Sequence, residues 1–73
     1  MIETDDDAKL WLTPREVQVL TCIATGLSAK EIAKKLNIAP RTVERHIDHI
    51  RLKTRTRNRS HMVAYAIAKG LIG

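Results

Sequence analysis

The basic side chains of the sequence, which can donate several hydrogen bonds, are concentrated between residues 41 and 59. Beside the two acids Glu44 and Asp48, this stretch holds seven basic residues: Arg41, Arg45, Arg51, Lys53, Arg55, Arg57 and Arg59. A guanidinium can bind phosphate or guanine with paired hydrogen bonds, and a carboxylate can accept from the cytosine amine. Taken alone, the stretch fits a solvated charged helix face as well as it fits a surface for a polyanion.

His46 and His49 lie three residues apart, a spacing that also occurs in metal sites. No cysteine and no third histidine is placed to complete such a site, and Glu44 and Asp48 are expected to face solvent. We therefore expect His46 to pack rather than to bind metal. The sequence has no nucleophile motif and no glycine-rich phosphate loop, so we predict no catalytic residue, no enzyme activity and no cofactor.

Length and composition define the class of protein. The 73 residues allow one domain, and the single Cys22 excludes an intramolecular disulfide. No apolar run approaches the roughly 20 residues of a membrane span, so we expect a cytoplasmic protein without membrane contact. Residues 1–11 carry four acids and are predicted to be an acidic flexible lead or linker, and residues 12–73 are predicted to form the domain.

Two capping boxes mark the first two helices. Thr13 precedes Pro14 with Glu16 three residues on, and Ser28 is followed by Glu31 at the same spacing. Gly26 and Asn37 supply the left-handed residue that ends each helix. The first helix is expected to bury the face formed by Val17, Leu20, Ile23, Ala24 and Leu27, and the second the face formed by Ile32, Ala33 and Leu36.

Two further helices are expected, giving an all-α fold: a compact four-helix bundle that contains a helix-turn-helix. The helix 40–54 has an apolar side and a side formed by Arg41, Glu44, Arg45, Asp48 and Leu52. The helix 59–70, capped by Asn58 or Ser60, is apolar over a wide arc. It could therefore bind a second copy of the chain, and the candidate dimerisation residues are Val63, Ala64, Ile67 and Leu71.

The short helix, the turn of about three residues and the long helix have the proportions of a DNA-binding helix-turn-helix. In that arrangement the second helix lies in the major groove. The start of the first helix, with its free amides and Lys30, suits a phosphate. An ordinary helical corner would have the same spacings.

Residues 12–72 also resemble, without a gap, the LuxR-type (GerE-type) helix-turn-helix domain of bacterial transcription regulators. The matching residues are Thr13, Arg15, Glu16, Val17, Leu20, Gly26, Lys30, Glu31, Ile32, Ala33, Leu36, Thr42, Val43, His46, Ile50, Lys53, Asn58, Arg59, Ala64, Ala66, Gly70 and Leu71. The resemblance implies four helices, sequence-specific reading of double-stranded DNA by the helix 40–54, and homodimerisation through the helix 59–70. In most members this domain follows a phosphoacceptor receiver, as in response regulators, or an acyl-homoserine-lactone-binding domain of quorum sensing. A few members consist of this domain alone.

The resemblance also assigns residues. The family's base-facing positions fall on Glu44, Arg45 and Asp48, and its phosphate-contacting positions fall near Ser28, Lys30, Arg41, Thr42 and Lys53. We hypothesise that the acids and Arg45 select sequence while the surrounding bases supply affinity. The alternative is that Glu44 pairs with a neighbour along its own helix, such as Arg41, and reads nothing.

Four residues depart from the family pattern. Ala39 replaces the usual cap of the helix 40–54. Thr54 and Thr56 replace apolar residues, so we expect loose packing there, and Leu52 is apolar on a side that is usually polar. Two other functions fit the pattern: a module that docks a protein such as an RNA polymerase subunit, and a sigma-factor-like unit that binds DNA only within a larger assembly.

Overall fold

The computed structural model describes residues 12–72 of the chain. It contains four helices, α2 (Pro14–Ala24), α3 (Ala29–Leu36), α4 (Pro40–Thr54) and α5 (Arg59–Ala68), and no strand within residues 12–72. The prediction of an all-α four-helix fold with a helix-turn-helix is therefore confirmed. The predicted acidic lead, residues 1–11, lies outside the described residues.

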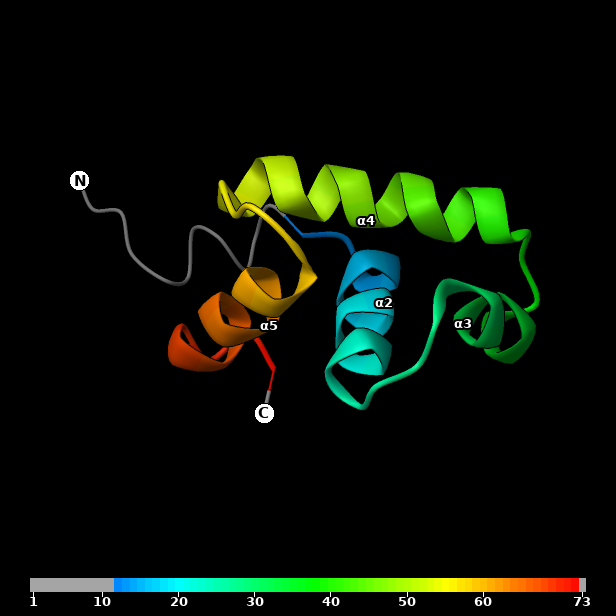
Figure 1. Cartoon of the computed structure of the whole chain (residues 1–73), viewed down its shortest axis with the longest axis horizontal. Helices are drawn as coiled ribbons and strands as arrows, with labels where there is room; N and C mark the ends of the chain where they lie inside the picture. The colour runs from blue at the N-terminus through cyan, green and yellow to red at the C-terminus, as the bar shows by residue number, and fades with distance from the viewer. Residues whose placement is uncertain (1–11, 73) are drawn as a thin grey trace.

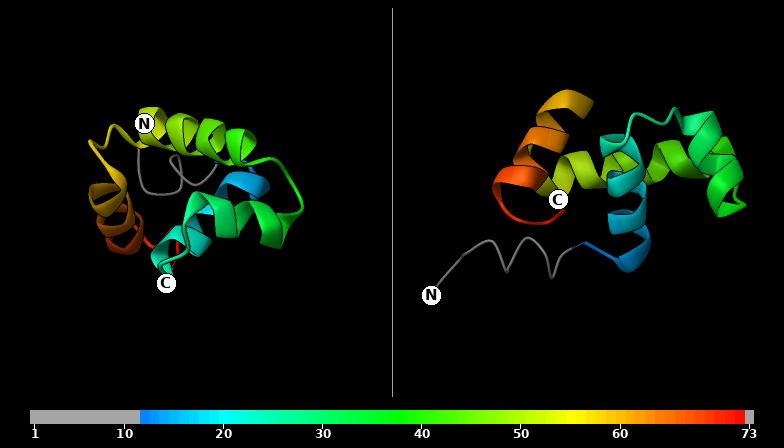
Figure 2. Two further views of the ribbon diagram at one scale, coloured as in Figure 1. Left: turned by 45° about the vertical axis from the view of Figure 1, so that its right-hand side comes forward. Right: turned by 90° about the horizontal axis from the view of Figure 1, so that it is seen from below.

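The longest helix, α4, runs along one side of the domain and contacts all three other described helices. In Figure 1 it lies across the top, with α2 below its middle, α3 near its beginning and α5 near its end. The two turned views in Figure 2 show the same arrangement. One long side of α4 therefore faces away from the rest of the domain.

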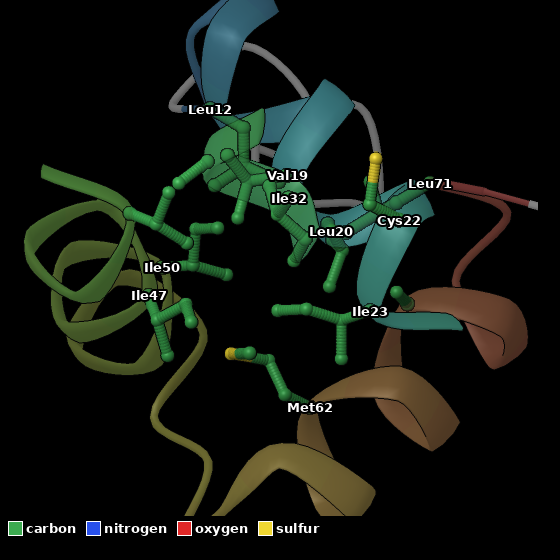
Figure 3. Close-up of a cluster of buried hydrophobic side chains, with 13 residues drawn as sticks. Leu12, Val19, Leu20, Cys22, Ile23, Ile32, Ile47, Ile50, Met62 and Leu71 are labelled. Atoms are coloured by element: carbon green, nitrogen blue, oxygen red, sulfur yellow. The ribbon is translucent and has the colours of Figure 1, made fainter. Parts of the chain in front are cut away.

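A single core joins the four helices (Figure 3). Val19, Leu20, Ile32, Ile50 and Met62 are completely buried and come from all four helices. The predicted face of α2 was only partly right, because Val19 is buried whereas Ala24 is exposed and Val17 and Leu27 are only half-buried. The contacts of α2 with α3, α4 and α5 bury an arc centred on Val19, Leu20 and Ile23.

The N-terminal caps explain where the helices begin. In α2 the Thr13 hydroxyl accepts from the Glu16 amide at 3.1 Å, and the Glu16 carboxylate accepts from the Thr13 amide at 2.9 Å. The same reciprocal pair joins Ser28 and Glu31 at the start of α3. The cap of α5 is Asn58, whose Oδ1 accepts from the amide of His61. At the start of α4, Ala39 has extended backbone and makes no side-chain cap.

The C-terminal ends of the helices share one geometry. Each has a left-handed residue whose N–H donates to the carbonyl three residues back, and the next N–H donates to the carbonyl five residues before it. The left-handed residues are Gly26, Asn37, Arg55 and Gly70. A residue with a Cβ in this conformation costs roughly 1–2 kcal/mol, which Asn reduces by local hydrogen bonding.

The end of α4 is well packed, so the expectation of loose packing at Thr54 and Thr56 was wrong. Both threonines are buried, with 6% and 5% exposure. Their hydroxyls are 2.9 Å apart, and the Thr54 hydroxyl also donates to the Ile50 carbonyl at 2.8 Å. Two polar side chains are tolerated in this position because they satisfy each other and the backbone.

The uncapped start of α4 gives a stability prediction. Ala39→Ser would place a hydroxyl on an already extended cap residue, next to amides that lack a side-chain acceptor. We expect the free energy of unfolding to rise by about 1 kcal/mol, measured by urea denaturation. Ser28→Ala should lower it by a similar amount, since it removes an existing cap. An unchanged or lower stability for Ala39→Ser would contradict this account of the helix start.

Candidate nucleic-acid interface

The exposed side of α4 is the candidate interface. Successive helix residues are separated by about 100°, so the buried line of Val43, Ile47 and Ile50 sets the direction of the opposite side. The predicted polar side is confirmed as exposed and consists of Arg41, Glu44, Arg45, Asp48 and Leu52. Leu52 is 66% exposed, the largest value among the exposed large hydrophobic residues described. In Figure 1, α4 itself runs along the outer edge of the domain.

The two arginines in the first half of this surface are not held by the domain itself. Neither Arg41 nor Arg45 makes a side-chain hydrogen bond or ion pair with another residue of the range 12–72. Their guanidinium groups are therefore hydrated and can exchange water for the oxygen atoms of a ligand. A planar guanidinium matches the spacing of two acceptors on phosphate or on guanine.

Glu44 is held from α5 rather than from its own helix. Its carboxylate accepts hydrogen bonds from the Arg59 guanidinium at 3.4 and 3.5 Å, so the partner is not Arg41, which was the alternative considered from the sequence. Both side chains are about half exposed, and an ion pair of this kind stabilises by only about 0–1 kcal/mol. The carboxylate can therefore exchange Arg59 for another donor at little cost.

The start of α3 offers a weaker anion site than its sequence indicates. The hydroxyl and amide of Ser28 are both used in the capping box, which places the Glu31 carboxylate at the same terminus. The exposed side chain of Lys30 is then the main positive group there. Lys30 and Lys34 line an open hollow of about 560 Å³ beside the turn to α4. Thr42, in the first turn of α4, is half-buried.

Lys53 has an internal role that the sequence did not reveal. Its ammonium lies 2.8 Å from the carboxylate of Glu16, and Glu16 is 3% exposed. Burial by itself would raise the pKa of Glu16, but the hydrogen bonds from Lys53 and from the Thr13 amide outweigh it and lower the pKa below its ordinary value. This ion pair connects the end of α4 to the start of α2. The sequence did carry one signal that Glu16 is buried. It lies three and four residues before Val19 and Leu20, and therefore on the same buried face of α2.

The two histidines of α4 differ in exposure. His46 is half-buried and His49 is exposed. Within residues 12–72, no group of three histidine, cysteine, aspartate or glutamate side chains is arranged to hold a metal ion.

No helix among residues 12–72 is long and apolar enough to cross a membrane.

The face of α5 is apolar and partly exposed. Ile67 is 57% exposed, Ala64 is exposed and Val63 is half-buried. Leu71 is 7% exposed and belongs to the core, so it supports this face from inside. The structure therefore separates the four predicted dimerisation residues into three at the surface and one within the core.

The short α3, the turn of residues 37–39 and the long exposed α4 make this a helix-turn-helix domain, an arrangement typical of DNA-binding proteins. The chain belongs to the family described as "Bacterial regulatory proteins, luxR family", whose sequence model matches residues 10–66. This membership confirms the resemblance and identifies the chain as a domain of the kind found in DNA-binding regulators of transcription.

Three curated relatives illustrate the family. A probable transcriptional regulator ycf29 of Cyanophora paradoxa is 43% identical over 67 residues, covering 92% of this chain and 32% of the relative. Response regulator Rre1 of Synechocystis is 40% identical over 93% of this chain and 29% of its own length. The oxygen regulatory protein NreC of Staphylococcus haemolyticus is 38% identical over 97% of this chain and 32% of its own length. The chain thus spans about a third of the length of these relatives.

The ion pair between α2 and α4 predicts a pH-dependent stability. We expect Lys53→Met to lower the free energy of unfolding at neutral pH by about 2 kcal/mol, because it leaves a buried carboxylate with one hydrogen bond. Glu16→Gln should cost less, about 1 kcal/mol, since the neutral amide still accepts from Thr13 and Lys53 can turn to water.

The sign of the pH effect follows from the lowered pKa of Glu16. The stabilisation is present above the unfolded pKa of about 4.3 and is lost as the pH falls through the lower folded value. Urea denaturation from pH 7 to pH 3 should therefore show the wild-type protein and Lys53→Met converging in stability at acid pH. Equal stability of the two at pH 7 would mean that Lys53 is not fastened to Glu16.

Proposed function

We propose that this chain is the sequence-specific double-stranded DNA-binding domain of a bacterial transcription regulator, with α4 in the major groove. The observation that carries the proposal is the exposed side of α4, where Arg41 and Arg45, which have no side-chain partner within residues 12–72, alternate with the acids Glu44 and Asp48. An α-helix fits the major groove, and the groove displays a distinct pattern of donors and acceptors for each base pair. Membership of the luxR family supports the same function.

Within this proposal the residues divide into two groups. Arg45 reads guanine through its paired N–H groups, and Glu44 and Asp48 accept from cytosine amines. Lys30, Arg41 and Thr42 contact phosphates and set the position of α4. Ser28 and Lys53 contribute less than the resemblance implies, because their polar atoms already serve the capping box and Glu16.

The larger protein is also part of the proposal. The relatives are about three times as long as this chain, and one is named a response regulator. We propose an N-terminal regulatory domain, of the receiver type, in a longer cytoplasmic protein, with residues 1–11 as its linker. Control of transcription would then involve contact with RNA polymerase. A quorum-sensing ligand domain is the other arrangement that the family offers.

The dependence of binding on salt tests the proposed function. Fluorescence anisotropy with a random duplex should show affinity falling steeply with salt, by about 0.9 in the logarithmic slope for each phosphate contacted. Selection from a random duplex pool should then return a preferred site. Binding that ignores salt would instead favour a protein-docking role, and a pool without enrichment would exclude sequence reading.

Replacing Glu44 distinguishes an acid that reads a base from one that only repels phosphate. Glu44→Ala should change the preferred base at one position of the selected site, with a discrimination loss of about 1–3 kcal/mol there. Arg59→Ala is the matched control, because it breaks the same ion pair and keeps the carboxylate. A uniform gain in affinity for every sequence with Glu44→Ala would mean that the acid only repels phosphate.

Self-association through α5 completes the proposal. Its exposed apolar surface is small, consisting mainly of Val63, Ala64 and Ile67, so we propose a dimer that forms mostly on DNA. Two copies on neighbouring half-sites, about 10 base pairs apart, would hold each other at a high effective concentration.

Ile67→Asp tests the dimer. It should weaken binding to a two-half-site duplex by roughly ten-fold or more while leaving binding to a single half-site unchanged. Because Ile67 is exposed, the variant should keep the stability of the wild-type protein, which urea denaturation checks. Equal losses on both duplexes, or no loss on either, would contradict a dimer through α5.

A further inference from the structure

The turn after α4 contains a residue that does not suit its backbone conformation. All four described helices end with the same pair of hydrogen bonds around one left-handed residue. At three of these ends the residue is Gly26, Asn37 or Gly70, the types that adopt this conformation readily. At the end of α4 it is Arg55, with φ 56° and ψ 41°.

Nothing in the described part of the domain explains an arginine there. Arg55 is exposed, and its side chain makes no hydrogen bond or ion pair with another residue between 12 and 72. It also lacks the short polar side chain that lets asparagine stabilise a left-handed backbone. A glycine would form the same turn with less strain, so the side chain itself is the feature to be explained.

The turn fixes the backbone of Arg55. Thr54 and Thr56, on either side, are buried and joined through their hydroxyls. The Arg55 amide donates to Leu52 and the Thr56 amide donates to Arg51, which fixes the backbone. With both neighbours pointing inward, Arg55 extends into solvent. It follows Asp48 by seven residues, about two helical turns, and so continues the exposed side of α4.

The length of α4 indicates what this arginine contacts. A helix of 15 residues is about 22 Å long, whereas the major groove is about 12 Å wide. A helix that crosses the groove therefore brings its two ends near different phosphate strands. Arg41 lies at one end and Arg55 at the other. The middle, with Glu44, Arg45 and Asp48, lies between them.

We infer that Arg55 is a phosphate-contacting residue at the far strand of the groove, and that its charge is the reason an arginine occupies a left-handed position. This inference rests on the proposed DNA-binding function and adds a second anchoring point for α4. With an anchor at each end, α4 is held against rotation and sliding in the groove. Neither the resemblance nor the two capping boxes assigns this role to the turn.

The competing explanation is that Arg55 stabilises the negative end of the α4 dipole, as a base near a helix C-terminus does. The two explanations predict opposite effects on stability. If the arginine is kept for DNA, replacing it by glycine relieves backbone strain and makes the domain more stable. If it is kept for the dipole, the same change makes the domain less stable.

The test compares three variants in thermal unfolding and in DNA binding. Arg55→Gly should raise the melting temperature by about 5 °C, because strain in the turn is relieved. It should weaken binding roughly five- to ten-fold at low salt, equally for the selected site and for random duplex, and reduce the salt slope by about 0.9. Arg55→Asn should show the same loss of binding with a smaller gain in stability, and Arg55→Lys should stay close to the wild-type protein in both.

Each outcome decides the inference. Unchanged affinity and salt slope for Arg55→Gly, with wild-type protein that does bind DNA, would overturn the role of Arg55 and leave the proposed function standing. A lower melting temperature for Arg55→Gly would assign the arginine to the helix dipole. Wild-type protein that shows no salt-dependent binding to any duplex would remove the proposed function itself.

Discussion

Burial of one line of side chains along α4 is the interaction on which the rest of the structure depends. Val43, Ile47 and Ile50 are covered by α2, α3 and α5, and Thr54 continues the line at the end. α2 also contacts the other three described helices, but α4 is the longer of the two, with 15 residues against 11. Because a helix is rigid, fixing the buried edge of α4 also fixes the direction of the opposite one. Core packing, rather than the conformation of a loop, thus decides which side chains of α4 are exposed to solvent.

A domain of this size has little core to spare, so polar contacts at the helix ends matter more than they would in a larger protein. Two capping boxes and the Asn58 cap define three helix starts. The start of α4 has no cap, and α4 is instead fixed by its buried edge and by Lys53 at the other end. The buried carboxylate of Glu16 is tolerated because it receives both a backbone amide and an ammonium group. Among residues 12–72 every buried side-chain nitrogen or oxygen has a hydrogen-bond partner.

The charges on the exposed side of α4 oppose each other in a way that suits recognition better than simple attraction. Arginines draw the surface toward phosphate, while Glu44 and Asp48 weaken that attraction unless a donor is placed opposite them. Arg59 partly neutralises the charge of Glu44, while the carboxylate stays exposed to solvent. A purely basic helix would bind every duplex about equally, since phosphates carry no sequence information. In the proposed function, this mixture makes affinity conditional on the bases.

Local patterns in the sequence determined the helices and their ends, because capping boxes, prolines, glycines and apolar spacing act within a few residues. Thr13 with Glu16 and Ser28 with Glu31 were enough to place α2 and α3, and the spacing of Val43, Ile47 and Ile50 was enough to orient α4. The same patterns missed what lies between helices. They did not reveal the ion pair of Lys53 with Glu16, 37 residues away in the chain. The alternative partner considered for Glu44 was Arg41 on the same helix, whereas the partner in the structure is Arg59 on α5. The patterns also placed Leu71 on the surface and expected loose packing at Thr54 and Thr56. Only the tertiary structure decides these points, because whether a side chain is buried or paired depends on which other helix comes to lie against it.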